Sequence, residues 1–461
     1  MKRKLSLFLT ILLALSLALA ACQPKTPTAA PAEESAPAEE AAPAEEAAPA
    51  EEGAPAEEAA PTEEVMPAQE VTLTIGFTAS ITGKYETSSG RQKRGFDLWM
   101  QQVNDAGGIK LSDGTVVKFA SVFYDDESST ERVQELYTRL ATEDNADLMI
   151  SPYSSGLTAA AAVIAEQNGK VMLTTGAASD ATYQQGYTGV FQIYTPASRY
   201  LTGAVDLLQS LDSEVSKVAF VYEDAKFATS VVEAAKDYAE SLGYEVVLFE
   251  AYSADTTDFG PFINKIVDSG AEVVLGGGHF QDGSTFARQL FEKGVRPKML
   301  ALLVAPPEPD FAELGDAAVG VIGPSQWEPL AAYTPESAAA AGLEWYGPSS
   351  EEFVSAYQAA YDGEEPSYHS AGGYAAGLVL QKAIEDADST DPEAIKAALE
   401  AMDVLTFFGH IKFDTSEENH GLQIGHSMVY VQWQKDADGN LVKQVVWPQE
   451  GATAEAIYPL P

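Results

Sequence analysis

Residues 147–179 read DLMISPYSSGLTAAAAVIAEQNGKVMLTTGAAS. This stretch contains two short apolar segments, 147–150 and 171–173, which we interpret as buried strands. Between them, the alanine-rich run 159–167 has helical character. Strands that are apolar throughout and separated by a helix are typical of a parallel sheet covered by helices. A loop rich in small residues follows each strand, at the end of the sheet where α/β proteins bind ligands.

The same alternation extends in both directions along the chain. In the first series we predict further strands at 71–77, 116–124 and 190–194, and helices at 96–103 and 130–142. A second series then begins, with strands at 218–222, 245–252, 273–275, 299–304 and 319–322 and helices at 228–242, 259–269 and 284–293. The fold class is therefore α/β, with two lobes built on parallel sheets and a cleft between them as the expected ligand site.

Five motifs together resemble the type I solute-binding proteins of ABC importers, in the branched-chain amino acid group. They are IGFTASITGKY (75–85), NDAGGIK (104–110), YDDESST (124–130), residues 151–179 of the stretch above, and YHSAGGYAAGLVLQKAIE (368–385). The resemblance covers about Val71 to Trp433. It implies two doubly wound parallel-sheet lobes joined by three crossovers, a periplasmic-binding-protein-like type I fold.

The resemblance also implies domain limits. The N-terminal lobe is expected to contain 71–195 and 328–420, and the C-terminal lobe 196–327 and 421–461. The three crossings are expected near 194–198, 324–328 and 417–428. The segments 428–434 and 441–447 are expected to form a hairpin around Asp436–Asn440, because this turn lacks the twelfth-position glutamate of a calcium loop.

A candidate anion site follows from the family's pattern, in which hydroxyls and main-chain amides at helix starts hold the ligand's carboxylate. Ser154 and Ser155 match the first such loop, and Ala177 and Ser179 match the second. Unpaired N–H groups and the helix dipole also favour an anion there on physical grounds. The alternative is that the same hydroxyls act as ordinary helix caps.

Aromatic and acidic residues complete the candidate pocket. The resemblance places Phe227 and His279 at aromatic positions of the second lobe. Tyr85 lies in the first loop, and Trp327 follows a predicted crossing. Amino-acid binders of the family pair the ligand's ammonium with a glutamate, but the matching position of this chain is Leu303 or Val304, or Glu308 if the loop is shifted.

Two explanations for that departure remain open. Either Asp282 or Glu328 replaces the missing glutamate, or the ligand is an amide or an organic acid without an ammonium group. An ammonium buried without a partner would cost several kcal/mol, on the order of the penalty for one desolvated ion.

The N-terminus predicts export and lipid attachment. Lys2, Arg3 and Lys4 precede an apolar run, 5–21, that resembles a signal peptide (1–21) ending at the lipobox of bacterial lipoproteins. Cys22, the single cysteine, occupies the acylated position. Residues 22–70 repeat Pro, Ala and Glu pairs and are expected to form a disordered tether. The alternative is a cut beside an incidental cysteine.

Composition excludes several function classes. The formal charge is −42, and 56 of the 69 acidic residues lie beyond residue 70, which disfavours nucleic acid as a partner. The five histidines show no zinc-site spacing, and no nucleophile motif or phosphate loop occurs. We therefore expect no enzyme activity, no cofactor and no metal.

The expected function is capture of a small carboxylate-bearing solute, with an amino acid favoured, and its delivery to ABC permease subunits from outside the cytoplasm. A ligand-sensing ectodomain and a surface hydrolase are the alternatives. The first would need a signalling segment and the second a nucleophile–base pair, and the sequence offers neither.

Overall fold

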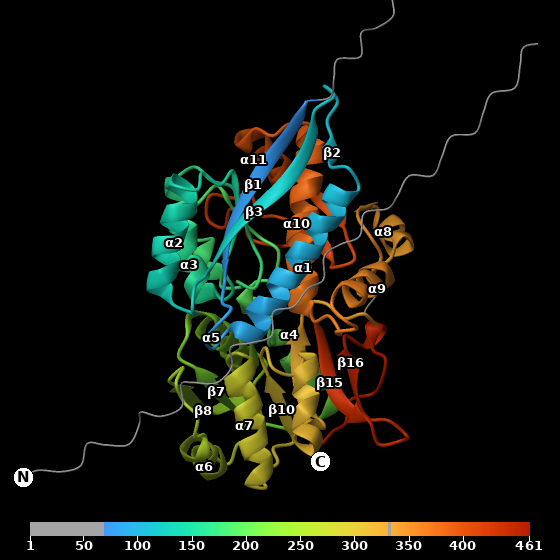
Figure 1. The fold of residues 1–461 in the computed structure, drawn as a ribbon. Helices are drawn as coiled ribbons and strands as arrows, with labels where there is room; N and C mark the ends of the chain where they lie inside the picture. The colour runs from blue at the N-terminus through green and yellow to red at the C-terminus, as the bar shows by residue number, and fades with distance from the viewer. Residues whose placement is uncertain (1–68, 331–332) are drawn as a thin grey trace, which may run out of the picture. The chain divides into compact units, whose positions relative to one another are not determined.

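The computed structural model describes residues 69–330 and 333–461, which belong to one compact unit. They form two α/β lobes, each built on its own sheet (Figure 1). The predicted signal peptide, Cys22 and nearly all of the predicted tether lie outside the described residues. Across the described ranges, none of the helices combines the length and apolar character that a bilayer-spanning segment needs.

The first lobe contains a six-stranded sheet in the order β2-β3-β1-β4-β5-β6. All neighbours pair in parallel except β2, which is antiparallel to β3. The strands are β1 (Glu70–Ala79), β2 (Ile109–Lys110), β3 (Val116–Asp125), β4 (Leu148–Ile150), β5 (Met172–Thr174) and β6 (Val190–Gln192). The helices between them are α1 (Glu86–Asp105), α2 (Thr130–Thr142) and α3 (Ser155–Gln167).

Both faces of this sheet are buried, as its apolar strands predict. Met149 and Met172 face a core that includes residues of α2 and α3. Their neighbours Leu148, Ile150 and Leu173 face a second core, shared with α1 and α10 (Tyr368–Ala387). Successive side chains of a strand point to opposite faces, so these short strands cannot show the polar alternation of a half-exposed sheet.

The second lobe repeats the arrangement with a seven-stranded sheet in the order β16-β15-β11-β10-β9-β7-β8. Its strands are β7 (Lys217–Glu223), β8 (Glu245–Tyr252), β9 (Val273–Gly277), β10 (Met299–Leu302), β11 (Ile322–Ser325), β15 (Val429–Lys435) and β16 (Leu441–Trp447). Its helices include α4 (Thr202–Leu211), α5 (Lys226–Ser241), α6 (Gly260–Ser269), α7 (Phe280–Glu292) and the 3-10 segment η3 (Pro309–Ala318). The predicted hairpin is present as the antiparallel pair β15–β16.

The chain passes between the sheets three times: after β6, after β11 and after β14. Between the second and third passages it forms α8 (Pro335–Ala341), β12 (Glu344–Trp345), α9 (Ser350–Ala360), α10, α11 (Pro392–Ala401), β13 (Asp403–Leu405) and β14 (His410–Lys412). Hydrogen bonds tie the three connections together: Thr195 N–H donates to Gln326 Oε1 (2.9 Å), and Thr195 Oγ1 lies 2.7 Å from His426 Nδ1. Three adjoining connections form a natural hinge.

The expected fold class is confirmed, while several local predictions need correction. The strand predicted at 319–322 begins at Ile322 instead, because η3 runs to Ala318 and Gly320 turns the chain at a φ of +82°. Helix α3 begins at Ser155, four residues before the alanine-rich run. The elements that were not predicted are the helices α4, α8, α9, α10 and α11, the short strand β2 and the three-stranded sheet β12-β13-β14. The exact domain limits within the connections stay a prediction.

Candidate functional site: a cavity between the lobes

A small cavity lies between the lobes, beyond the carboxyl ends of several strands. Its volume is about 10 Å³, room for about one water molecule. The first lobe lines it with Tyr153, Ser154, Gly176, Ala178, Tyr194, Tyr368 and His369. The second lobe lines it with Tyr200, Phe227, His279 and Val304. Most of the wall is therefore aromatic, and both lobes contribute to it.

Ser154 precedes α3 in a strained backbone conformation, with φ +80° and ψ 146°. Such a conformation costs a non-glycine residue about 1–3 kcal/mol and is often kept at functional sites. It is held by the Ser154 N–H, which donates to Gly176 O (3.0 Å), and by the Ser154 Oγ, which accepts from Leu157 N–H (3.3 Å). The hydroxyl thus lies in the cavity wall at a helix N-terminus, where the dipole favours an anion.

The hydroxyl of the neighbouring Ser155 binds backbone amides of the following loop. Its Oγ accepts hydrogen bonds from the N–H groups of Ala178 (3.1 Å) and Ser179 (3.0 Å). The amide of Ser179, in the loop expected to hold a ligand carboxylate, therefore has a partner within the protein, as does the amide of its neighbour Ala178. Ser179 Oγ in turn lies 3.0 Å from Ser230 Oγ on α5, so this loop joins the two lobes directly.

His279 is held by a carboxylate from the end of β7. Its Nδ1 lies 2.6 Å from Glu223 Oε2, while Lys84 of the first lobe reaches Glu223 Oε1 at 2.8 Å. Burial alone would raise the pKa of Glu223, but His279 and Lys84 outweigh this effect and lower the pKa to about 2. Glu223 is therefore ionised near neutral pH.

Asp282 lies behind His279 rather than in the cavity wall. Its Oδ1 accepts from His279 N–H (2.8 Å) in a capping box at the start of α7, and its Oδ2 accepts from the Tyr252 hydroxyl. Donor atoms of Glu223, His279 and Asp282 lie within 4.8 Å of one another, a spacing that a metal ion could bridge. The Lys84 ammonium, 2.8 Å from Glu223 Oε1, balances the charge of one of the two carboxylates.

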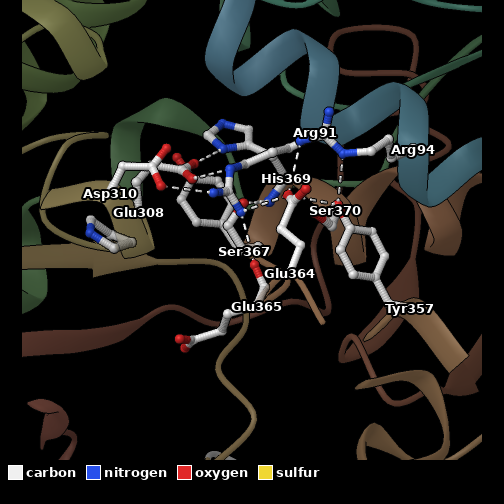
Figure 2. A network of polar contacts seen from close by, with 12 residues as sticks. Arg91, Arg94, Glu308, Asp310, Tyr357, Glu364, Glu365, Ser367, His369 and Ser370 are labelled. Atoms are coloured by element: carbon white, nitrogen blue, oxygen red, sulfur yellow. Dashed lines mark hydrogen bonds and ion pairs between the residues drawn. The ribbon is translucent and has the colours of Figure 1, made fainter. Parts of the chain in front are cut away.

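A second group of charges crosses between the lobes around Glu308, which follows β10 (Figure 2). Arg91 of α1 contacts Glu308 (Nε–Oε2, 3.4 Å), Asp310 (Nη2–Oδ1, 3.1 Å) and Glu364 (Nη1–Oε1, 3.2 Å). Glu308 also hydrogen-bonds to Nδ1 of His369, on α10. Arg91, Glu308 and His369 are all buried, so the two lobes share a desolvated ionic contact.

The charge states of Glu308 and His369 follow from their burial and from the charged groups around them. Burial would raise the pKa of Glu308, but the hydrogen bond from His369 and attraction to Arg91 and Lys443 lower it overall. Burial lowers the pKa of His369, against the opposing pull of Glu308. Glu308 is therefore ionised, and a neutral His369 donates from Nδ1 to it. This arrangement leaves the other ring nitrogen of His369 as an acceptor.

The low pKa of Glu223 predicts acid sensitivity. A carboxylate whose pKa falls from 4.5 when free to about 2 in the folded protein stabilises the fold fully above pH 4.5. That stability is lost as the pH falls through 2 and amounts to about 3 kcal/mol. Urea unfolding between pH 7 and pH 2.5 checks this: Glu223→Gln should show a weaker pH dependence than the unchanged protein. Parallel curves would contradict the assignment.

Comparison with known proteins places the chain in a family. Residues 72–440 match the family model described as periplasmic binding protein. The chain belongs to the periplasmic binding protein family. The resemblance drawn from the five sequence motifs is thereby confirmed, and membership in this family implies a location outside the cytoplasm.

Curated proteins and solved structures that are similar to this periplasmic binding protein are themselves named as binding proteins. It is 29% identical over 378 residues to the Leu/Ile/Val-binding protein homolog 7 of Brucella suis biovar 1, covering 79% of this chain and 89% of the relative. A branched-chain amino acid transporter substrate binding protein from Streptococcus pneumoniae, in complex with isoleucine, has a TM-score of 0.65 at 20% identity over 82% of this chain and all of the other. A solute binding protein from Rhodopseudomonas palustris, in complex with p-hydroxybenzoic acid, has a TM-score of 0.68 at 20% identity, covering 85% and 98%.

The structure brings most of the predicted site residues of this periplasmic binding protein to one place. Ser154, Phe227 and His279 line the cavity. The ring of Tyr85 packs 4.7 Å from that of His279, across the lobe boundary. Ser155, Ala177 and Ser179 are buried beside the cavity and support its wall. Whether any of these residues binds a ligand stays a prediction.

Trp327 needs a correction. Its indole Nε1 donates to Ser350 Oγ (3.3 Å), and its ring packs edge-on against Phe353 and Phe407 in the core of the first lobe. It therefore does not line the cavity. Glu328, considered as an ammonium partner, is also elsewhere: it forms a buried ion pair with Lys443 (3.0 Å).

Sequence reasoning missed the residues that make the wall aromatic. Tyr153 and the pair Tyr368–His369 lie within quoted motifs, yet they were not singled out, while Tyr194 and Tyr200 flank the first crossing. The signal that could have identified these residues is their position at the carboxyl end of a predicted strand or at the start of a helix, where ligands bind in α/β proteins. The partners Lys84, Arg91 and Glu223 carried no local signal, because their contacts join residues at least 56 positions apart in the sequence.

Proposed function

We propose that this periplasmic binding protein captures a small carboxylate-bearing solute and delivers it, chemically unchanged, to the permease subunits of an ABC importer. The cavity walled by both lobes carries this proposal. A ligand there touches both lobes only when they are closed, so binding favours closure about the hinge. The relatives named for leucine, isoleucine and valine, and the neighbours crystallised with isoleucine or p-hydroxybenzoic acid, support a small organic acid.

The arrangement of polar groups favours binding over catalysis. The polar groups near the cavity are paired to one another: His279 with Glu223, His369 with Glu308, and Ser154 with Leu157. A hydrolase would need a nucleophile hydrogen-bonded to a base, and the Ser154 hydroxyl instead caps α3. Among the described residues, the two cavity histidines contact carboxylates and not a hydroxyl nucleophile.

Ligand binding without turnover tests the proposal. A ligand present at one hundred times its dissociation constant should stabilise the closed protein by about 2.7 kcal/mol and raise its melting temperature. A thermal-shift screen of amino acids, amides and short organic acids measures this effect. Mass spectrometry of the recovered ligand supplies the control. Conversion of a hit to another molecule, or the absence of any hit, would contradict the binding function.

We further propose that the mature chain starts at Cys22 and is held to the membrane by a lipid on that residue. The basic start, the apolar run 5–21 and the single cysteine support this. A tether of the composition of 22–70 would let the binding lobes reach a permease at some distance from the anchor. The mass of the N-terminal peptide from membrane-extracted protein distinguishes an acylated from a free cysteine.

A further inference from the structure

The carboxylates nearest the cavity all have partners inside the protein. Glu223 is held by Lys84 and His279, and Glu308 by Arg91 and His369. Both oxygens of Asp282 accept hydrogen bonds from protein donors. None of the residues that line the cavity is an aspartate or a glutamate.

The positions where an ammonium partner was considered offer none. Val304 lines the cavity with an apolar side chain, and Leu303 is buried in the core. Glu328 is engaged by Lys443 and is absent from the cavity wall. An α-amino acid would therefore bury its ammonium against a wall that contains no carboxylate, which costs several kcal/mol, on the order of an unpaired buried charge.

Aromatic rings dominate the wall itself. The Tyr200 and Phe227 rings pack 5.2 Å apart on one side, and Tyr153 and His369 pack 5.0 Å apart on the other. Aromatic faces pack well against another flat ring, in offset or edge-on geometry. The closed cavity has room for about one water, so a ring must enter while the lobes are apart and the wall side chains must turn to receive it.

Hydrogen-bond donors suited to an acid are present in the same wall. The Ser154 hydroxyl lies at the N-terminus of α3, and Tyr153 and Tyr368, each with a phenol group, line the same small space. Burial raises the pKa of Tyr153 and of Tyr368 well above the ordinary value, so both remain protonated donors. Donors in an aromatic wall that contains no carboxylate match a ligand carboxylate on a flat body.

We infer that the ligand is a small aromatic carboxylic acid without an amino group. The inference rests on the proposed binding function and specifies its ligand class. In this arrangement the ring packs against Phe227 and Tyr153, and the carboxylate is received by the Ser154 hydroxyl and the tyrosine donors. The ion pairs of Glu223 with Lys84 and of Glu308 with Arg91 then hold the two lobes together. They do not bind the ligand.

Matched ligand pairs that differ by one amino group test this inference by calorimetry on the purified protein. The pairs are 3-phenylpropanoate with L-phenylalanine, and 4-methylpentanoate with L-leucine. Each deaminated acid should bind at least about tenfold more tightly than its amino acid, which corresponds to 1.4 kcal/mol. Benzoate should bind more tightly than benzamide, because the amide lacks the charge.

Tighter binding of L-phenylalanine or L-leucine would overturn the inference and leave the binding function intact. If one of the compounds is consumed, the proposed function itself fails. If none of them binds while the broader thermal-shift screen finds a ligand, the inference fails and the binding function stands. Tighter binding of 4-methylpentanoate than of 3-phenylpropanoate would overturn the aromatic assignment alone.

Three variants test which residues are responsible for the ligand preference. Phe227→Leu keeps an apolar side chain in the wall and should weaken 3-phenylpropanoate binding about tenfold, while Phe291→Leu, on the exposed face of α7, should leave it unchanged. Asp282→Asn should not weaken binding of the acid, because Asp282 does not contact it. A large loss of L-phenylalanine affinity in Asp282→Asn, together with a preference for amino acids, would identify Asp282 as an ammonium partner and overturn the inference. Melting curves confirm that each variant is folded.

Discussion

Replacing Glu308 with glutamine is expected to destabilise the closed arrangement of the lobes by about 3 kcal/mol. Removing one charge of a buried pair leaves the other desolvated and uncompensated, which costs about 3–5 kcal/mol. The lower figure applies because Asp310 and Glu364 still contact Arg91. A change of this size shifts the ratio of closed to open molecules about a hundredfold. Small-angle X-ray scattering should show a larger radius of gyration, and ligand affinity should fall because closure costs more.

Asp310→Asn provides the matched control. Asp310 contacts the same guanidinium at 3.1 Å, but its side chain is 41% exposed, and exposed ion pairs contribute about 0–1 kcal/mol. The scattering profile and the affinity of this variant should stay close to those of the unchanged protein. Equal effects of Glu308→Gln and Asp310→Asn would show that burial of the Glu308 contact does not hold the lobes closed.

Gly373→Ala is expected to destabilise the whole fold by about 3 kcal/mol, at the upper end of the usual cost of overpacking. A methyl group at Gly373 would lie 2.0 Å from the backbone oxygen of Gln92. The opposing Gly95 is equally close to Ser370 O, at 1.8 Å. Helices α1 and α10 therefore touch through their backbones, and neither can move without disturbing the core of the first lobe (Figure 1). Chemical denaturation followed by circular dichroism measures the loss.

Gly90→Ala on the same helix α1 controls for helix propensity. A methyl group at Gly90 would meet nothing nearer than Arg94 Nη1, at 3.6 Å, and alanine favours the helix by roughly 0.5–1 kcal/mol. This variant should be as stable as the unchanged protein or slightly more stable. If Gly373→Ala were equally harmless, the helices would have room to separate and the close backbone contact would not limit stability.

The sequence predicted the fold well because its signals are local. The apolar strands at 147–150 and 171–173 and the helix between them can be recognised from neighbouring residues alone. The predicted boundaries were wrong where a turn or a helix cap sets them. The turn at Gly320 places the start of β11 later than predicted, and the cap at Ser154 places the start of α3 before the alanine-rich run. Those boundaries depend on backbone conformations that periodicity does not encode.

The sequence also predicted where the cavity would be, because carboxyl ends of parallel strands meet at one edge of each sheet. It could not distinguish a wall residue from a supporting one. Trp327 and Phe227 are both buried aromatic residues, yet the first packs within one lobe and the second faces the other lobe. The direction of a side chain depends on the crossing geometry of distant segments.

By itself, the sequence determined the α/β class, the two series of strands and helices, and the loops that meet at the cleft, since each is set by residues close together in the chain. The tertiary structure alone decided the charge pattern of the site. Glu308 meets Arg91 and His369, and Glu223 meets Lys84, only because folding brings the two lobes into contact. Burial of these carboxylates makes pairing with cations energetically necessary.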